Sequence, residues 1–174
     1  MYDDTKLNVP LKKIEEKWKL VPAFLRLRGL VKQHIDSFNY FLNVEMRRIV
    51  TAEDNCTITS DHPSYRDYFI EFTDIYVGNP VIKDEQGYHN LTPNECRIRD
   101  MTYSAPIFVD VKYTRGNSIC VQPKVCIGRM PIMLGSSKCW LTGMNHEELA
   151  KIRECPFDPK GYFIIKGSEK VVLI

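Results

Sequence analysis

Five basic side chains in the second half of the sequence are the residues best suited to chemistry, because a Lys or Arg near a loop or strand end can hold a phosphate group. They are Arg129, Lys138, Lys160, Lys166 and Lys170. Such contacts would follow a nucleic-acid backbone without reading its sequence, and salt would weaken them. The alternative is that these lysines only aid solubility, and for any single one this alternative is favoured.

The sequence motifs of common enzyme classes are missing. No G-x-x-x-x-G-K-[ST] run forms a P-loop, and no G-x-G-x-x-G follows a predicted strand. The run G-S-S-K-C from Gly135 to Cys139 lacks the second glycine of a nucleophile elbow. Two-metal catalysis needs clustered aspartates, whereas Asp158 stands alone in a predicted turn. The sequence therefore predicts no catalytic residue.

The six cysteines and four histidines do not have the spacing of a metal site. No C-x-x-C pair occurs, and the closest cysteines, Cys120 and Cys126, are separated by five residues. No signal peptide is apparent, so we interpret the cysteines as reduced and mostly buried thiols. No apolar run approaches the ~20 residues of a membrane span. We therefore expect no metal, no cofactor and no membrane contact in this chain.

Charge is distributed unevenly, although the net charge is only +2. Residues 1–50 carry +4, residues 51–100 carry −6 and residues 101–174 carry +4. Such a distribution fits a surface that meets nucleic acid on one side only. An unevenly charged solvated surface explains it equally well.

A long amphipathic helix is the first element that would position these residues. Its apolar residues recur at steps of three or four, which is the period of one helix face: Val31, Ile35, Phe38, Leu42, Met46 and Ile49. Gly29 marks the start of this run, and the polar residues 51–55 end it. The helix is predicted to pack its apolar face against a sheet.

Strands are predicted beyond the helix. Residues 68–77 are β-branched and aromatic, and residues 81–96 form a polar, turn-rich connection. Residues 105–114 alternate in polarity and turn at R-G-N, which predicts a hairpin. Residues 118–134 supply the return strand and another, each interrupted by a proline, so edges or bulges are expected.

The last third adds a short helix near 145–153, with Asn145 as its N-cap, and a C-terminal hairpin that turns at Gly-Ser-Glu. The predicted fold class is therefore α+β, with the long helix packed on a mixed, mainly antiparallel sheet. At 174 residues the chain allows one domain. We assign residues 1–23 to a leader and residues 24–174 to the domain.

Four segments resemble a known family in their order and wording. They are "GLVKQHIDSFNYFL" (29–42), "ECRIRDMTYSAPIFVDVKYTRG" (95–116), "IGRMPIMLGSSKC" (127–139) and "ECPFDPKGYFIIKGSEKVVLI" (154–174). They are similar to the N-terminal part of the second-largest subunit of eukaryotic multi-subunit RNA polymerases, in the region called the protrusion. The wording resembles RNA polymerase III most, and the resemblance covers roughly residues 24–174.

The resemblance implies a nuclear transcription enzyme that synthesises RNA from NTPs on a DNA template. Its catalytic Mg²⁺ would sit on an aspartate triad of the largest subunit, so this chain would hold no catalytic residue and no cofactor. The chain would form one wall of the DNA cleft as an incomplete domain that continues past Ile174. Its expected partners are the largest subunit, other polymerase subunits and template DNA. By similarity Lys170 is the residue most expected to face nucleic acid, followed by Lys166 and Arg129.

One position departs from the family pattern. The family usually reads P-I-M-L-R-S, whereas Gly135 stands here in place of the arginine. The resemblance therefore leaves any polar contact of that arginine in doubt. The alternative to a polymerase segment is a self-contained adaptor that keeps the fold, binds a protein partner and makes no nucleic-acid contact.

Overall fold

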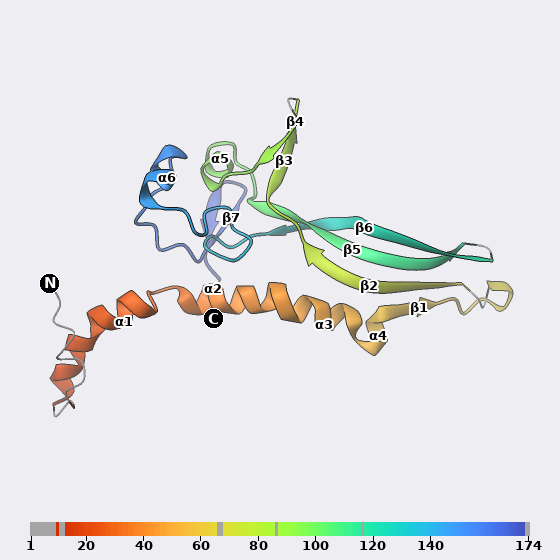
Figure 1. Ribbon diagram of the computed structural model, residues 1–174, viewed down its shortest axis with the longest axis horizontal. Coiled ribbons are helices and arrows are strands. Elements are labelled where there is room, and N and C mark those ends of the chain that lie inside the picture. Colours follow the sequence, from red (N-terminus) through yellow and green to blue (C-terminus); the bar gives the residue numbers. More distant parts are fainter. Residues whose placement is uncertain (1–9, 11–12, 66–67, 86, 116, 173–174) are drawn as a thin grey trace.

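The C-terminal part of a long helix lies beside a four-stranded sheet that extends past the end of the helix, and smaller elements gather at the other end of the strands (Figure 1). The structure, a computed structural model, describes residues 10, 13–65, 68–85, 87–115 and 117–172. Within these residues, no helix combines the length and apolar character that a membrane span requires.

The long helix is composed of three consecutive elements that continue into one another: α2 (Lys32–Tyr40), the π-helical turn η3 (Phe41–Glu45) and α3 (Met46–Thr51). The predicted helix is thus confirmed, with Leu42 and Met46 buried, whereas Ile49 at the end of the stripe is 52% exposed. Among the described residues, the 3-10 helix η2 (Ile14–Leu20) and the helix α1 (Val21–Leu27) precede it. Gly29 separates them from the long helix with a φ of +61°, a conformation that glycine adopts without strain.

The sheet has the strand order β1-β2-β5-β6, and every described pairing in it is antiparallel. Its strands are β1 (Thr57–Thr59), β2 (Phe69–Val77), β5 (Ser104–Arg115) and β6 (Ser118–Pro131). The turn η4 (Pro63–Tyr65) lies between β1 and β2, and α4 (Glu53–Cys56) leads into β1. The hairpin expected at R-G-N is confirmed, because Arg115 pairs with Ser118.

The return from this hairpin is one long strand, not the two that were predicted. Its internal proline lies in a bulge and does not end the strand. Val111 pairs with Gln122 and Val109 pairs with Val125, so Pro123 and Lys124 have no paired residue on β5 in the strand register. The Lys124 N–H donates a hydrogen bond of 2.8 Å to Asp110 Oδ1 across the bulge. The expectation of an edge or a bulge is confirmed, because β6 is at the edge of the sheet and carries this bulge.

A second bulge lies at the same level on the other side of β5. Asp74 of β2 pairs with Asp110 of β5, and Thr73 is the inserted residue. The Thr73 hydroxyl donates a hydrogen bond of 3.0 Å to the Asp110 carbonyl. Asp110 therefore contacts both irregular sites, with its side chain at one and its carbonyl at the other.

The α3 part of the long helix lies beside β2, which confirms the predicted packing of the helix on a sheet. The Arg47 guanidinium of α3 contacts both carboxylate oxygens of Asp74 on β2, at 3.1 and 3.2 Å. Behind this exposed pair, Ile49 and Val50 line a shallow apolar hollow with Ile75 of β2. The helix is thus held to the sheet by one ion pair and by apolar contact.

Residues 81–98 contain structure where only a connection was expected. They form β3 (Val81–Asp84), β4 (Gly87–Asn90) and α5 (Pro93–Ile98). The Thr92 hydroxyl caps α5 by accepting the Glu95 N–H at 3.2 Å, and Pro93 supplies a first helical residue that needs no hydrogen-bond partner. The short second helix near 145–153 is confirmed as α6 (His146–Lys151), and the C-terminal hairpin as β7 (Phe163–Ile165) and β8 (Ser168–Lys170).

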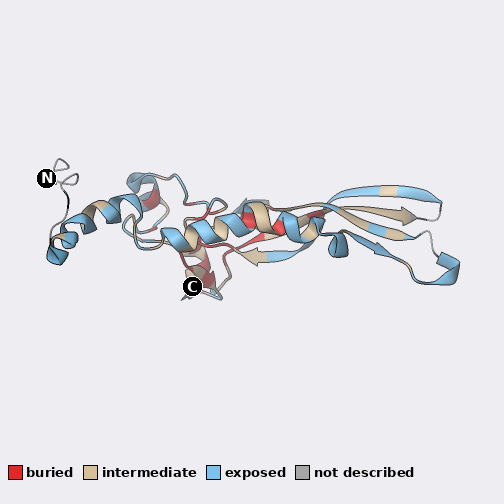
Figure 2. Cartoon of the chain, turned by 90° about the horizontal axis from the view of Figure 1, so that it is seen from below, coloured by how far each residue is buried: buried red, intermediate tan, exposed pale blue. Residues whose placement is uncertain are grey.

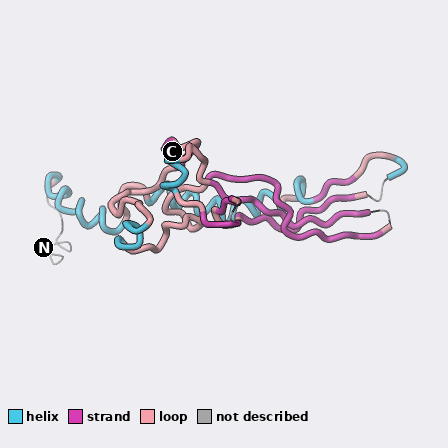
Figure 3. Tube along the Cα trace, turned by 90° about the horizontal axis from the view of Figure 1, so that it is seen from above, coloured by secondary structure: helices cyan, strands magenta, loops and turns pink. Residues whose placement is uncertain are grey.

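The core lies where the sheet meets these small elements. Figure 2 shows the buried residues gathered there, while the far end of the strands is exposed or half-buried. Figure 3 shows that most loops lie in the same part. Five large side chains are fully buried: Tyr103, Ile132, Leu134, Leu141 and Ile164. Backbone hydrogen bonds join their segments, since Tyr103 N–H donates to Ile164 and Ile132 N–H donates to Tyr103.

Stability should decline at alkaline pH because of groups in this core. Burial raises the pKa of the Cys96 thiol from 9.0 to about 11, and burial also raises the pKa of Tyr103. An acid whose pKa is raised on folding contributes stability that is complete below its unfolded pKa and is lost as the pH rises through the folded value. Urea unfolding should therefore give a free energy that these two groups leave unchanged below about pH 9 and lower as the pH rises above it. The variant Cys96→Ala should show a shallower decline, and an equal decline would contradict the assignment to this thiol.

Candidate nucleic-acid interface

The C-terminal hairpin carries two of the three residues expected to contact nucleic acid. Its two-residue turn consists of Lys166 and Gly167, with φ values of +48° and +75°. Two left-handed residues in sequence are the conformation of a type I′ hairpin turn. The turn therefore lies one residue earlier than the predicted Gly-Ser-Glu, because Ser168 and Glu169 are already in β8.

Strand alternation places Lys170 on a different face from Glu169. Phe163 pairs with Lys170 and Ile164 pairs with Glu169, so these two pairs point to opposite sides of the hairpin. Ile164 is fully buried on its side. Lys170 borders a shallow apolar hollow of about 330 Å³ on the other side, whose remaining lining is Phe38, Met130, Pro131, Phe163, Ile165 and Val172.

The backbone of the hairpin is anchored while its lysines remain exposed. The Lys166 N–H donates a hydrogen bond of 3.1 Å to Thr102 Oγ1, and the Gly167 N–H donates one of 2.9 Å to the Met101 carbonyl. The side chains of Lys166 and Lys170 are both exposed. Within the described residues, neither ammonium group has an ion pair or a hydrogen bond. Both ammonium groups can therefore bind an anion from outside the chain.

A buried ionic cluster beneath the hairpin was not predicted from the sequence. At its centre the Arg97 guanidinium of α5 donates to Glu154 Oε2 at 2.9 Å, to Glu169 Oε1 at 2.9 Å and to the Tyr162 hydroxyl at 2.8 Å. Tyr162 in turn donates to Asp158 Oδ2 at 2.5 Å. Asp158 is therefore not alone, as its place in a turn suggested, but part of this cluster.

Burial and neighbouring charges shift the pKa values of Arg97 and Tyr162 in this cluster. Glu154 is only 5% exposed, and its second oxygen accepts the Asn94 N–H at 2.6 Å. Burial lowers the pKa of Arg97, but the hydrogen bond and the charge of Glu154 outweigh it, so the pKa is raised. Burial and the hydrogen bond to Asp158 raise the pKa of Tyr162. Arg97 thus remains a cation and Tyr162 a neutral donor at neutral pH.

Arg129, the third predicted contact, lies in a different setting. Its guanidinium donates to Ser104 Oγ at 3.1 Å, to the Ser104 carbonyl at 2.9 Å and to the Val81 carbonyl at 2.9 Å. These bonds join β6 to the starts of β5 and β3. Arg129 therefore bridges neighbouring strands although it is exposed, and its contact with nucleic acid stays a prediction, as do those of Lys166 and Lys170.

Of the two remaining basic candidates, Lys160 lies beside Gly135 and Lys138 is half-buried in the loop between β6 and α6. Gly135 has a φ of +80°. A side chain at this position would thus adopt a strained backbone conformation. A Cβ atom there would also lie 3.1 Å from both Cβ and Cδ of Lys160.

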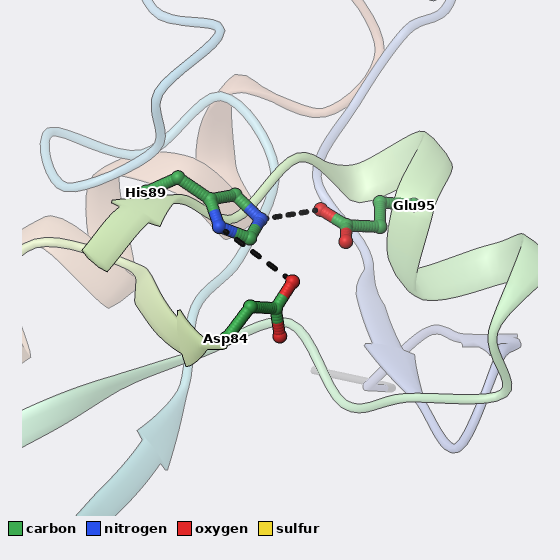
Figure 4. Close-up of side chains that lie close together, drawn as sticks. All are labelled: Asp84, His89 and Glu95. Carbon is green, nitrogen blue, oxygen red and sulfur yellow. Dashed lines mark ion pairs between the residues drawn. The ribbon is translucent and has the colours of Figure 1, made fainter. Parts of the chain in front are cut away.

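Three side chains near the β3–β4 hairpin form a group of potential metal ligands: Asp84, His89 and Glu95 (Figure 4). His89 Nδ1 lies 3.8 Å from Asp84 Oδ2, and His89 Nε2 lies 3.5 Å from Glu95 Oε2. Arg99 also pairs with both carboxylates, and its hydrogen bond to Glu95 and the charge of Asp84 raise its pKa. Mg²⁺ prefers an octahedral set of oxygens, so these residues do not fit that ion. The contact between His89 and Glu95 links the β3–β4 hairpin to α5.

The chain is similar to known proteins of one family. Residues 29–174 match the family described as RNA polymerase beta subunit. The chain is 55% identical over 99% of its length to the DNA-directed RNA polymerase III subunit rpc2 of Dictyostelium discoideum, and 49% identical over its whole length to the RNA polymerase III subunit RPC2 of Schizosaccharomyces pombe. It is 34% identical over 99% of its length to the RNA polymerase II subunit RPB2 of Eremothecium gossypii.

The chain spans only a small part of these relatives. It corresponds to 11% of the Dictyostelium protein, 15% of the fission-yeast protein and 16% of the Eremothecium protein. The domain boundary at residue 24 and the continuation of the chain past Ile174 stay predictions; residues 173–174 lie outside the described residues.

Proposed function

The chain belongs to the RNA polymerase beta subunit family, and we propose that it is part of the second-largest subunit of a DNA-directed RNA polymerase III. The observation that carries this proposal is the 55% identity over 99% of the chain to a polymerase III subunit. The identity to the polymerase II subunit is lower, at 34%. The adaptor alternative is not favoured, because the relatives are polymerase subunits along the whole chain.

The assembled enzyme would synthesise RNA from NTPs on a DNA template in the nucleus. Catalytic Mg²⁺ would be held by the largest subunit, which is the principal expected partner. This chain would form one wall of the DNA cleft and hold DNA through its phosphates. The free charges of Lys166 and Lys170 on an anchored hairpin support this role.

Affinity purification from the native cells tests the assignment. A tagged form of the full-length protein that carries this chain should co-purify with a largest polymerase subunit, and the preparation should synthesise RNA only when DNA and all NTPs are present. Mass spectrometry of the largest subunit identifies the polymerase class. Recovery with a polymerase II or I largest subunit would contradict the class, and recovery without polymerase subunits would favour the adaptor.

Neutralising the two hairpin lysines should weaken DNA binding in a salt-dependent manner. Each lost phosphate contact should reduce the slope of log affinity against log salt by about 0.9. We therefore expect the variant Lys166→Ala with Lys170→Ala to bind duplex DNA more weakly at low salt and with a shallower slope. The measurement is fluorescence anisotropy on the assembled polymerase over a range of salt concentrations.

The control variant for this experiment is Lys151→Ala, which removes one exposed charge from α6. It should leave the salt slope unchanged, because α6 is separate from the hairpin. An unchanged slope in the double variant would show that the hairpin does not contact DNA.

A further inference from the structure

Lys160 has a backbone conformation that its residue type does not favour. Its φ is +62°, and the next residue, Gly161, has a φ of +79°. A residue with a Cβ atom pays roughly 1–2 kcal/mol for the left-handed region, whereas glycine does not. Strained residues of this kind persist where the surrounding structure holds them, and they cluster at functional sites. The side chain of Lys160 is therefore the feature that needs explaining.

The stem of Lys160 occupies the space that Gly135 leaves open. A Cβ atom at position 135 would lie 3.1 Å from two carbons of this stem and 3.2 Å from Ile35 Cδ1 of α2. Real Cβ atoms rarely make contacts this close, so a larger residue at 135 would displace the lysine. The Lys160 stem thus packs against Gly135, and it can do so because Gly135 has no side chain.

The charge of Lys160 is not neutralised inside the fold. The ammonium group donates only one hydrogen bond, of 3.4 Å, to the Leu141 carbonyl, and no carboxylate among the described residues pairs with it. The nearby carboxylate of Asp158 accepts the backbone N–H of Lys160 and the Tyr162 hydroxyl instead. The residue is half-buried, so its stem is held by packing, and its ammonium group has no carboxylate partner among the described residues.

We propose that Lys160 is a further nucleic-acid contact, whose ammonium group binds a backbone phosphate and whose position depends on Gly135. This inference rests on the proposed function, because it assumes that the surface faces DNA. A preorganised lysine binds phosphate with less loss of side-chain entropy than a free one.

Two variants separate charge from packing. Lys160→Gly removes the charge and relieves the backbone strain, so it should fold at least as well as the natural chain. Lys160→Met keeps most of the stem and removes only the charge. In the assembled polymerase, both should reduce the salt slope of binding to a duplex DNA by about 0.9 and leave the thermal midpoint unchanged or raised. Lys151→Met is the matched control and should change neither quantity.

Three outcomes would overturn the inference. If Lys170→Ala lowers the slope and both Lys160 variants leave it unchanged, Lys160 does not bind DNA although the proposed function stands. If the Lys160 variants lower the thermal midpoint and leave the salt slope unchanged, the side chain stabilises the fold and does not bind DNA. If Lys151→Met lowers the slope equally, the effect reflects net charge and not a site. Failure of the proposed function is recognised separately, because Lys166→Ala and Lys170→Ala would then have no effect either.

Discussion

The variant Arg97→Ala is expected to destabilise the chain by about 3–5 kcal/mol, because it leaves a buried carboxylate without its cation. Glu154 is 5% exposed and receives its charge-balancing hydrogen bond from Arg97 at 2.9 Å. The same change removes the bonds to Glu169 and Tyr162, which hold β8 and the start of β7 to α5. Urea unfolding of the purified chain measures the loss, and the hairpin should become the least protected segment in hydrogen exchange.

A matched control is available in Arg47, which pairs with Asp74 through two similar contacts at the surface. Arg47→Ala should cost only about 0–1 kcal/mol, because exposed ion pairs are weak. The double variant Arg97→Ala with Glu154→Gln should recover part of the loss, since the buried charge is then absent. Equal losses for Arg97→Ala and Arg47→Ala would contradict the buried-cluster interpretation.

Gly167→Ala is expected to cost about 2–4 kcal/mol, from backbone strain together with overpacking. At a φ of +75° the added Cβ would lie 2.6 Å from Asp100 Oδ1 and 3.0 Å from Asp100 Cα. The second distance matters more, because a side-chain oxygen can move whereas the backbone of the adjacent loop cannot. The turn should therefore lift from residues 100–102, and Lys166 should lose its hydrogen bond to Thr102.

The control for this prediction is Gly29→Ala. Gly29 has a similar φ of +61°, but an added Cβ would meet nothing within 4 Å. Its expected cost is therefore the strain alone, about 1–2 kcal/mol. Thermal unfolding of both variants gives the comparison. If Gly167→Ala costs no more than Gly29→Ala, the turn is not pressed against the loop.

Elements with one strong periodic signal were predictable from the sequence. The helix through Leu42 and Met46, the β5–β6 hairpin and the capped helix α6 each follow from local spacing. The strands β3 and β4 were missed because they are short and polar, with turn residues on both sides. The proline in β6 produced a bulge where a second strand was expected, since a bulge interrupts pairing without ending it.

The candidate interface was only partly predictable, for a different physical reason. The lysines of the hairpin were recognised from residue type and family resemblance, but Arg97 was not. Its partners lie 57, 65 and 72 residues away in sequence, so no local pattern brings them together. The hydrogen bonds of Arg129 to neighbouring strands were likewise not predicted, whereas its expected contact with nucleic acid stays a prediction. The turn was misplaced by one residue because a lysine at positive φ is uncommon.

The two bulges that meet at Asp110 have a mechanical consequence. The strands β5 and β6 extend from the core together with β2 and β1, past the end of the long helix (Figure 1). A sheet resists bending through its continuous ladder of hydrogen bonds, and it yields where that ladder is interrupted on both sides of one strand. We therefore expect the outer part of the sheet to bend relative to the core at the level of Thr73, Asp110 and Lys124.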